Sequence, residues 1–525
     1  MDVTADPDLC AALREDLRDA GFTASALRAA WGALADDAIG RGLTGPALTA
    51  LGERADALAV LARVLFLGVT APVADVDAAL PRLRSAGLAG LGLAAVEDER
   101  VVPRALVRPQ EFADAAGSGL WWIARDLDEG ALGGALPPGH VLGVGGASMT
   151  LAGLQLPSYA ARVLDVGAGC GIQALRALRY ADSVVATDVS ERALQFTRLN
   201  ALLAGAGDRI ETRLGSLFAP VRGELFDRVV SNPPFVITPR LADVPAYEYR
   251  DGGMAGDDLV AAVVAQVGAV LAPGGVAQLL GNWEYRVGAD GLERVRGWVA
   301  DSAVPLDAWI IEREQLDPLA YAELWVRDGG TAPGSPEYAR LVGAWLADFD
   351  ARGVTAIGFG YVLLHRPASG APTLARYERL SQPVSASLGE HLLAALTAWG
   401  RMGLMDDAEL AASTLVTAAD VTEARHHLPG AEAPSVIELR QGAGFARTIE
   451  VDPALAALVG ASDGDLPVGA LVAAIAELLE VDAVSLAADL LPRVRELLVT
   501  GFLAFAGSPI AEAPAGSEVT YPGPR

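Results

Sequence analysis

The segment Val163–Gly171, with the sequence VLDVGAGCG, constrains the fold of this chain more than any other stretch. Its apolar start predicts the end of a buried strand, Asp165 stands at the strand's tip, and the residues after Gly171 predict a helix. Together with Gly167 and Gly169, Gly171 makes every second residue of this segment a glycine. Without side chains at these positions, the backbone can come close to a ligand at the helix N-terminus. This spacing differs from the G-x-G-x-x-G of dinucleotide-binding enzymes. The segment therefore predicts a nucleotide-sized site between a strand and a helix.

A second acid ends the next predicted strand. Residues 184–187 are apolar and lead to Asp188, and Ser190 is a candidate N-cap for a helix over 190–203. A carboxylate at the end of that strand can accept both hydroxyls of a ribose through charge-assisted hydrogen bonds. Strands and helices alternate onward from here, which is typical of an α/β fold with a mostly parallel sheet.

The fourth predicted strand, 226–231, ends in the string Asn232-Pro233-Pro234-Phe235. The Asn232 side-chain oxygen and the Pro233 carbonyl can each accept a hydrogen bond from one NH2 group. Pro233 and Pro234 stiffen the loop because each ring fixes φ and removes a donor, and Phe235 can lie against a planar amide or base. These four residues are the catalytic candidates: two acceptors on one NH2 group would aim its nitrogen lone pair at an electrophile by positioning alone. This chemistry needs neither a metal nor a nucleophilic side chain.

DVGAGCGIQAL followed by SNPPF resembles the small-domain superfamily of class I S-adenosylmethionine (SAM) methyltransferases, over about residues 140–285. That superfamily includes enzymes that methylate release-factor glutamine, ribosomal-RNA guanine and adenine amino groups. The resemblance implies SAM as cofactor and a seven-stranded, Rossmann-like sheet, with strands six and seven near 309–313 and 357–365. Residues 249–253 and 256–259 are similar to the D-G-G-x-x-G-x-x-L element of the glutamine branch. Ser216 stands where the family often has an acid beside adenine. The residues that the resemblance assigns to the cofactor are Asp165, Gly167, Ala168, Gly169, Gly171, Asp188, Val189, Ser216, Leu217 and Asn232.

The chain's 525 residues are too many for a single core, so several domains are expected. Helical periodicity followed by a hairpin around Glu97–Glu99 predicts a winged-helix-like N-terminal domain over 1–115. We expect the methyltransferase domain at 116–367, a second helical, winged-helix-like domain at 374–510, and a disordered tail at 511–525. The apolar runs are shorter than a membrane span, the start of the chain lacks a signal pattern, and two cysteines make no disulfide framework or zinc cluster. We therefore expect a cytoplasmic protein.

Charge and motif together order the hypotheses of function. A net charge of −26 repels nucleic acid and suits a basic protein target. The first hypothesis is N-methylation of a protein glutamine side chain, on a release factor or ribosomal protein. The alternatives are N-methylation of an exocyclic amine in RNA or DNA, N-methylation of a small molecule, and a SAM-binding regulator without catalysis. An RNA or DNA enzyme predicts an arginine stripe leading to Phe235, whereas the nearby arginines at 222, 228, 240 and 250 are scattered in the sequence.

Overall fold

The computed structural model describes residues 2–132, 136–240, 250–384 and 388–507. The chain divides into two compact units, unit 1 over residues 1–381 and unit 2 over residues 382–525. Among the described residues, no helix is both long and apolar enough to cross a membrane. The predicted tail at 511–525 lies outside the described residues.

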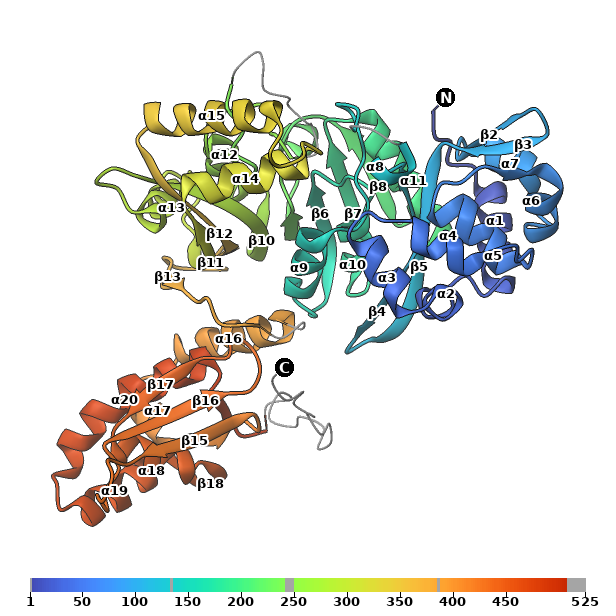
Figure 1. Cartoon of the computed structure of the whole chain (residues 1–525). Helices are drawn as coiled ribbons and strands as arrows, with labels where there is room; N and C mark the ends of the chain where they lie inside the picture. Colours follow the sequence, from blue (N-terminus) through green and yellow to red (C-terminus); the bar gives the residue numbers. More distant parts are fainter. Residues whose placement is uncertain (1, 133–135, 241–249, 385–387, 508–525) are drawn as a thin grey trace. The chain divides into compact units, whose positions relative to one another are not determined.

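Unit 1 contains an eight-stranded mixed sheet in the order β13-β11-β12-β10-β9-β6-β7-β8 (Figure 1). Strands β6 to β10 pair in parallel, and β12 runs antiparallel to both of its neighbours. The seven predicted strands coincide with seven of these eight. The strands are β6 (Ala160–Val166), β7 (Ala181–Asp188), β8 (Ile210–Leu214), β9 (Phe226–Ser231), β10 (Leu271–Arg286), β11 (Asp307–Leu316), β12 (Val354–His365) and β13 (Ala375–Arg379).

The eighth strand corrects two predictions, the strand count and the domain boundary at residue 374. β13 lies beside β11 in parallel, with Ala308 opposite Ala375 and Glu312 opposite Arg379. The Trp309 indole also donates a hydrogen bond of 2.6 Å to Glu378. These backbone and side-chain bonds attach 375–379 to the methyltransferase sheet, and unit 1 accordingly ends at residue 381.

Helices cover both faces of this sheet, and the strand register decides which residues face them. Leu164, Val229 and Ala277 stand in one row and share an apolar cluster with Val260 and other residues of α12. The helices of this part are α8 (Glu129–Leu132), α9 (Gly146–Leu154), α10 (Ile172–Ala177), α11 (Glu191–Leu203), α12 (Asp258–Val267), α13 (Gly291–Ala300), α14 (Pro318–Asp328), α15 (Pro336–Ala351) and the short 3-10 turn η2 (Ala219–Val221). The predicted N-cap at Ser190 is confirmed, since its hydroxyl accepts the Ala193 amide.

The N-terminal part of unit 1 is helical with two hairpins. The predicted hairpin at 97–99 is present, with Asp98 and Glu99 both at positive φ, the turn geometry that suits the twist of two strands. Its elements are α1 (Pro7–Asp19), α2 (Ala24–Trp31), α3 (Ala33–Gly40), α4 (Gly45–Leu51), α5 (Ala57–Leu61), η1 (Ala62–Phe66), β1 (Ala71–Pro72), α6 (Val73–Ala79), α7 (Arg84–Gly90), β2 (Ala94–Glu97), β3 (Arg100–Pro103), β4 (Ala105–Asp114) and β5 (Gly117–Asp126).

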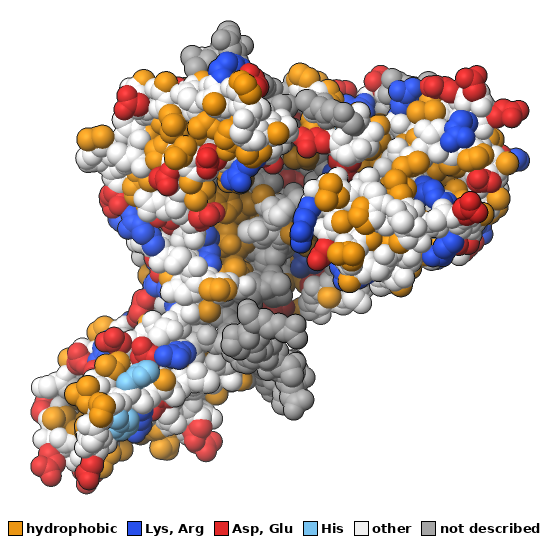
Figure 2. Space-filling view, viewed as in Figure 1, with side chains coloured by type: hydrophobic (Ala, Val, Ile, Leu, Met, Phe, Trp, Pro, Cys, Tyr) orange, Lys and Arg blue, Asp and Glu red, His pale blue; other side chains and the backbone are white. Residues whose placement is uncertain are grey.

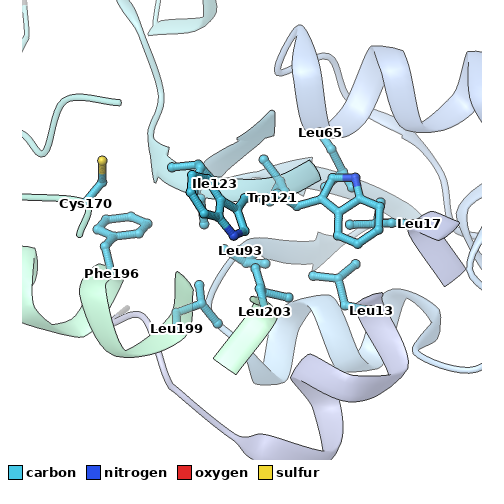
Figure 3. Close-up of a cluster of buried hydrophobic side chains, with 14 of the residues drawn as sticks. Leu13, Leu17, Leu65, Leu93, Trp121, Ile123, Cys170, Phe196, Leu199 and Leu203 are labelled. Carbon is cyan, nitrogen blue, oxygen red and sulfur yellow. The ribbon is translucent and has the colours of Figure 1, made fainter. Parts of the chain in front are cut away.

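This N-terminal part shares one hydrophobic core with the sheet's helices. In Figure 3, Leu13 and Leu17 of α1 gather with Leu199 and Leu203 of α11, and all four are buried. The predicted boundary between residues 115 and 116 falls in the turn of the β4–β5 hairpin, whose strands pair from Ala105–Asp126 to Asp114–Gly117. Residues 1–115 are therefore continuous in packing with the methyltransferase sheet. The winged-helix assignment stays a prediction.

Unit 2 has its own core and two small sheets, in the orders β18-β14-β19 and β15-β16-β17. Strands β16 and β17 pair antiparallel, and α20 ends at Gly501, which adopts a left-handed conformation. Its elements are α16 (Leu388–Met402), α17 (Asp407–Ala412), β14 (Thr414–Thr417), β15 (Val421–His426), β16 (Val436–Gln441), β17 (Thr448–Val451), α18 (Pro453–Gly460), β18 (Asp463–Pro467), α19 (Val468–Leu479), α20 (Ala483–Thr500) and β19 (Leu503–Phe505).

Candidate active site

The predicted site residues meet at the carboxyl ends of four neighbouring parallel strands. The chain runs outward from β6 through β7 to β8, then returns to place β9 on the other side of β6. Val166, the last residue of β6, lies opposite both Thr187 and Ser231. The Ser231 hydroxyl donates a hydrogen bond of 2.7 Å to the Val166 carbonyl, which joins the two strand ends. Ligands of open α/β sheets bind at such a reversal of strand order, because the loops diverge there and leave a crevice.

The glycine loop between β6 and α10 is open at Gly167 and Gly169 and tightly packed at Gly171. Gly167 and Gly169 have φ values of 75° and 56°, and a Cβ built on either would meet nothing within 4 Å. Gly171, with φ of 82°, would instead place a Cβ 3.0 Å from the Thr197 side chain of α11. The Thr197 hydroxyl also donates to the Gly169 carbonyl at 3.0 Å. Helix α11 thus holds the loop from one side, while the backbone at 167 and 169 stays accessible.

Asp165 is completely buried at the end of β6, and neither carboxyl oxygen makes a hydrogen bond of normal geometry within the described part of the chain. Burial raises the pKa of this carboxyl to about 7, with the Ala174 backbone amide acting in the opposite direction and the Asp188 carboxylate adding to the rise. Asp165 is therefore a buried carboxyl group directly before the glycine loop.

Asp188 is half-buried at the end of β7 and organises the backbone around it. One carboxylate oxygen accepts the Gly169 amide and the other accepts the Ser190 amide, each at 2.9 Å. A carboxylate at the end of a parallel strand, beside a glycine loop, is placed where open α/β sheets bind the ribose hydroxyls of a nucleotide. Val189 follows with its side chain exposed. The arrangement fits the predicted contact with ribose hydroxyls.

The loop after β8 carries the predicted adenine-side residues. The Gly215 amide donates to the Asp188 carbonyl at 2.9 Å, which brings this loop beside the end of β7. Ser216 is exposed, and Leu217 is half-buried with φ of 50°, a left-handed conformation that is strained for a leucine. The structure therefore brings Ser216 and Leu217 to the same edge as the glycine loop.

Asn232 begins the loop beyond β9, immediately beside the glycine loop. Its Oδ1 atom is buried and has no hydrogen-bond partner among the described residues, although an isolated buried acceptor is costly. Pro233 is buried, and the Phe235 ring lies 5.5 Å from the ring of Phe359 on β12. The Val236 amide donates to the Arg250 carbonyl at 2.9 Å, so this loop is held by the segment similar to the glutamine branch. Tyr249 of that segment lies outside the described residues.

Sequence reasoning missed two polar residues beside this loop. The Tyr321 hydroxyl on α14 accepts the Ile237 amide at 3.1 Å and lies 2.6 Å from the amide nitrogen of Asn282 on β10. Burial raises the pKa of Tyr321. The only available signal was a single asparagine inside the apolar string VAQLLGNW, which marks Asn282 but not its partner.

The nearby arginines do not form a stripe leading to Phe235. Arg240 pairs with Asp251, and Arg250 pairs with Asp328 at 2.7 Å. Arg228 is buried and donates to Ser158. On the face shown in Figure 2, blue arginine side chains lie among red acidic ones. The positive charge close to the site is therefore largely neutralised within the chain.

Comparison with known proteins agrees with this geometry. Residues 145–246 match the family described as the methyltransferase small domain. Residues 19–104 and 394–505 match two families that are each described as a domain of unknown function. The chain is 34% identical over 131 residues to a release factor glutamine methyltransferase from Moorella thermoacetica, covering 23% of this chain and 46% of that protein. It is 31% identical over 183 residues to a ribosomal protein uL3 glutamine methyltransferase from Burkholderia pseudomallei, covering 31% of this chain and 59% of that protein.

The chain thus spans about half the length of the curated relatives it matches. Among solved structures, the ribosomal protein L11 methylase from Lactobacillus delbrueckii aligns over 44% of this chain and 84% of that one at 19% identity, with a TM-score of 0.25 too low to carry an argument. The glycine loop, the strand ends and the sequence matches over the same residues all point to a SAM-dependent methyltransferase domain in the central part of this chain.

Proposed function

We propose that this chain transfers a methyl group from SAM to the side-chain nitrogen of a glutamine in a cytoplasmic protein. The observation that carries the proposal is Asn232 Oδ1, a buried acceptor without a partner among the described residues, located beside an accessible glycine loop. The relatives named for glutamine methylation of release factors and uL3 support this choice of acceptor.

The residues present fit SAM. When bound, SAM supplies an electrophilic methyl group on its sulfonium. The open backbone at Gly167 and Gly169 admits the ligand closely, and the Asp188 carboxylate at the end of β7 suits the ribose hydroxyls. Ser216 and Leu217 line the edge proposed for adenine. Asp165 supports the loop from below.

On the acceptor side, Asn232 Oδ1 and the Pro233 carbonyl would each accept one N–H of the glutamine amide. These bonds turn the nitrogen lone pair toward the methyl group and raise its electron density. Phe235 packs along the amide plane, and Pro234 keeps the loop stiff. The N–C bond forms as the S–C bond breaks, and one amide proton leaves to solvent. Catalysis then consists of positioning and polarisation by Asn232 and Pro233.

A protein target agrees better with the charges than a nucleic acid does. The chain has a net charge of −26, and Arg240 and Arg250 near the acceptor loop are engaged with Asp251 and Asp328. A basic translation factor or ribosomal protein would be attracted to such a surface. We assign recognition of that partner to residues 1–115 and to unit 2.

The test follows radiolabelled methyl from SAM into an extract of the source cells, with wild type and Asn232→Ala compared. We expect label that survives nuclease, is lost to protease, and is released as volatile methylamine by acid hydrolysis, as an N-methyl amide requires. Asn232→Ala is expected to lower transfer roughly 100- to 1,000-fold while still binding SAM. Label lost to nuclease, or full activity of Asn232→Ala, would contradict the proposal.

A further inference from the structure

A second amide side chain lies on the same face of the sheet as Asn232, one strand away. Leu279 of β10 is opposite Ser231 of β9. Extending this register one residue beyond the end of β9 places Asn232 level with the residue after Leu279, and Asn282 stands two residues further along that face. At about 3.3 Å per residue and about 4.8 Å between strands, the two backbone positions are roughly 8 Å apart. Their side chains can reach the two ends of one small planar group.

Asn282 is next to Phe359, whose ring packs against the ring of Phe235 in the proposed acceptor loop. It lies opposite Phe359 on β12, whose ring is 5.5 Å from the ring of Phe235. Asn282 is only 2% exposed, and as placed its Nδ2 atom faces Tyr321 while its buried Oδ1 atom has no hydrogen-bond partner among the described residues. A buried amide that has one of its two polar atoms hydrogen-bonded and the other without a partner indicates that a ligand supplies the missing hydrogen bond.

The bond to Tyr321 decides which end of the Asn282 amide is free. The Tyr321 oxygen already accepts the Ile237 amide at 3.1 Å, so its single proton needs an acceptor. The Asn282 amide lies 2.6 Å from this oxygen and is the group placed to accept that proton. Because amide oxygen and nitrogen are assigned from the hydrogen-bond network, we assign the Asn282 oxygen to the Tyr321 hydroxyl. Its NH2 group then forms the free end.

Tyr321 is itself held in place, so the orientation of Asn282 is fixed before any substrate arrives. The Tyr321 ring lies 6.0 Å from each of the rings of Trp345 and Phe349, and 6.1 Å from that of Trp325. In Figure 1, the helices α14 and α15 that carry these rings run beside each other.

We propose that the Asn282 NH2 group donates a hydrogen bond to the carbonyl oxygen of the acceptor amide, while Asn232 accepts from its nitrogen. This subsite rests on the proposed function and makes it more specific. It selects a primary carboxamide over an alkyl amine, because an amine has no oxygen to satisfy the Asn282 donor. Tyr321 is a positioning residue that orients Asn282.

The test uses Asn282→Asp in the full chain. One carboxyl oxygen of this variant still accepts the Tyr321 hydroxyl, and the other replaces the NH2 group. When ionised, that oxygen repels the acceptor carbonyl. When protonated, it can donate in place of the amide, and burial raises the pKa of such a carboxyl. We expect kcat/KM for the extract protein to fall roughly 10- to 100-fold at pH 8.5 and to recover toward wild type at pH 5.5, with KM for SAM unchanged.

Two further variants make the result decisive. Asn282→Leu is close in volume and cannot donate at any pH, so its loss should be independent of pH. Gln266→Glu makes the same amide-to-acid change on the exposed side of α12 and should follow wild type. An Asn282→Asp enzyme as active as wild type at pH 8.5, or a fully active Asn282→Leu, overturns the subsite. If wild type releases no methylamine, the proposed function fails. If the wild type does release methylamine and Asn232→Ala is inactive, the proposed function stands, and the Asn282 variants then test the subsite alone.

Discussion

Replacing Gly171 by alanine is expected to destabilise unit 1 by about 1–3 kcal/mol more than the same replacement at Gly167. Both glycines have similar positive φ values, 82° and 75°, so the cost of a left-handed alanine is nearly equal and cancels in the comparison. Only the Gly171 methyl group collides, at 3.0 Å from the Thr197 side chain and 3.2 Å from its Cα atom. Because α11 cannot move away from the core easily, this contact becomes strain in the folded state.

Urea unfolding followed by tryptophan fluorescence measures this difference. Of the nine tryptophans, all except Trp399 lie in unit 1, so the signal reports mainly on that unit. With an m-value of about 3 kcal/mol per molar urea, the Gly171→Ala midpoint should lie about 0.3–1 M below that of Gly167→Ala. SAM binding should show the reverse order, since a methyl group at Gly167 enters the open space above the loop and should weaken affinity roughly tenfold or more. Equal midpoints, or unchanged SAM affinity of Gly167→Ala, would refute this account of the loop.

Three further predictions concern acids of unit 1. The pKa of Asp165 is about 7 in the folded chain against about 4 in the unfolded chain. The stabilisation from its protonated form is therefore fully present below about pH 4 and is lost as the pH rises to 7, a decline of up to about 4 kcal/mol in the free energy of unfolding. Asp165→Asn should remove this decline when unfolding is measured from pH 4 to 8. Asp188→Asn keeps only one acceptor oxygen, so it should weaken SAM binding about tenfold by calorimetry and loosen the loop at Gly169, whereas unchanged affinity would exclude a ribose contact. Asp114→Ala leaves Arg176 and Arg179 without the carboxylate with which both pair, and should lower the free energy of unfolding in urea by about 3 kcal/mol. A change below about 0.5 kcal/mol, the size expected for a surface substitution, would show that these ion pairs contribute little.

Local sequence predicted the elements whose chemistry is contained within a few residues. The glycine loop, the strand ends at Asp188 and Asn232, and the cap at Ser190 each follow from neighbouring residue types. The hairpin at 97–99 is also a local feature. For such elements the backbone preference and the apolar pattern agree, so the sequence alone is sufficient.

The eighth strand and the shared N-terminal core could not be predicted in this way. The string at 375–379 is short and polar and becomes a strand because β11 presents an unpaired edge to it. Likewise, the apolar face of α1 predicts burial but does not name α11 as its partner. Both outcomes depend on contacts between segments that are far apart along the chain.

The sequence by itself indicated the cofactor class of this protein and a candidate acceptor motif, because a glycine spacing and the string Asn232–Phe235 carry their chemistry in consecutive residues. Only the tertiary structure decided what surrounds that motif. Asn282 and Tyr321 are 39 residues apart, and Tyr321 is 84 residues from Ile237, yet they meet at hydrogen-bond distance. Their orientation depends on the packing of α14 against the sheet, and no local pattern encodes a contact that is made only when distant segments fold together.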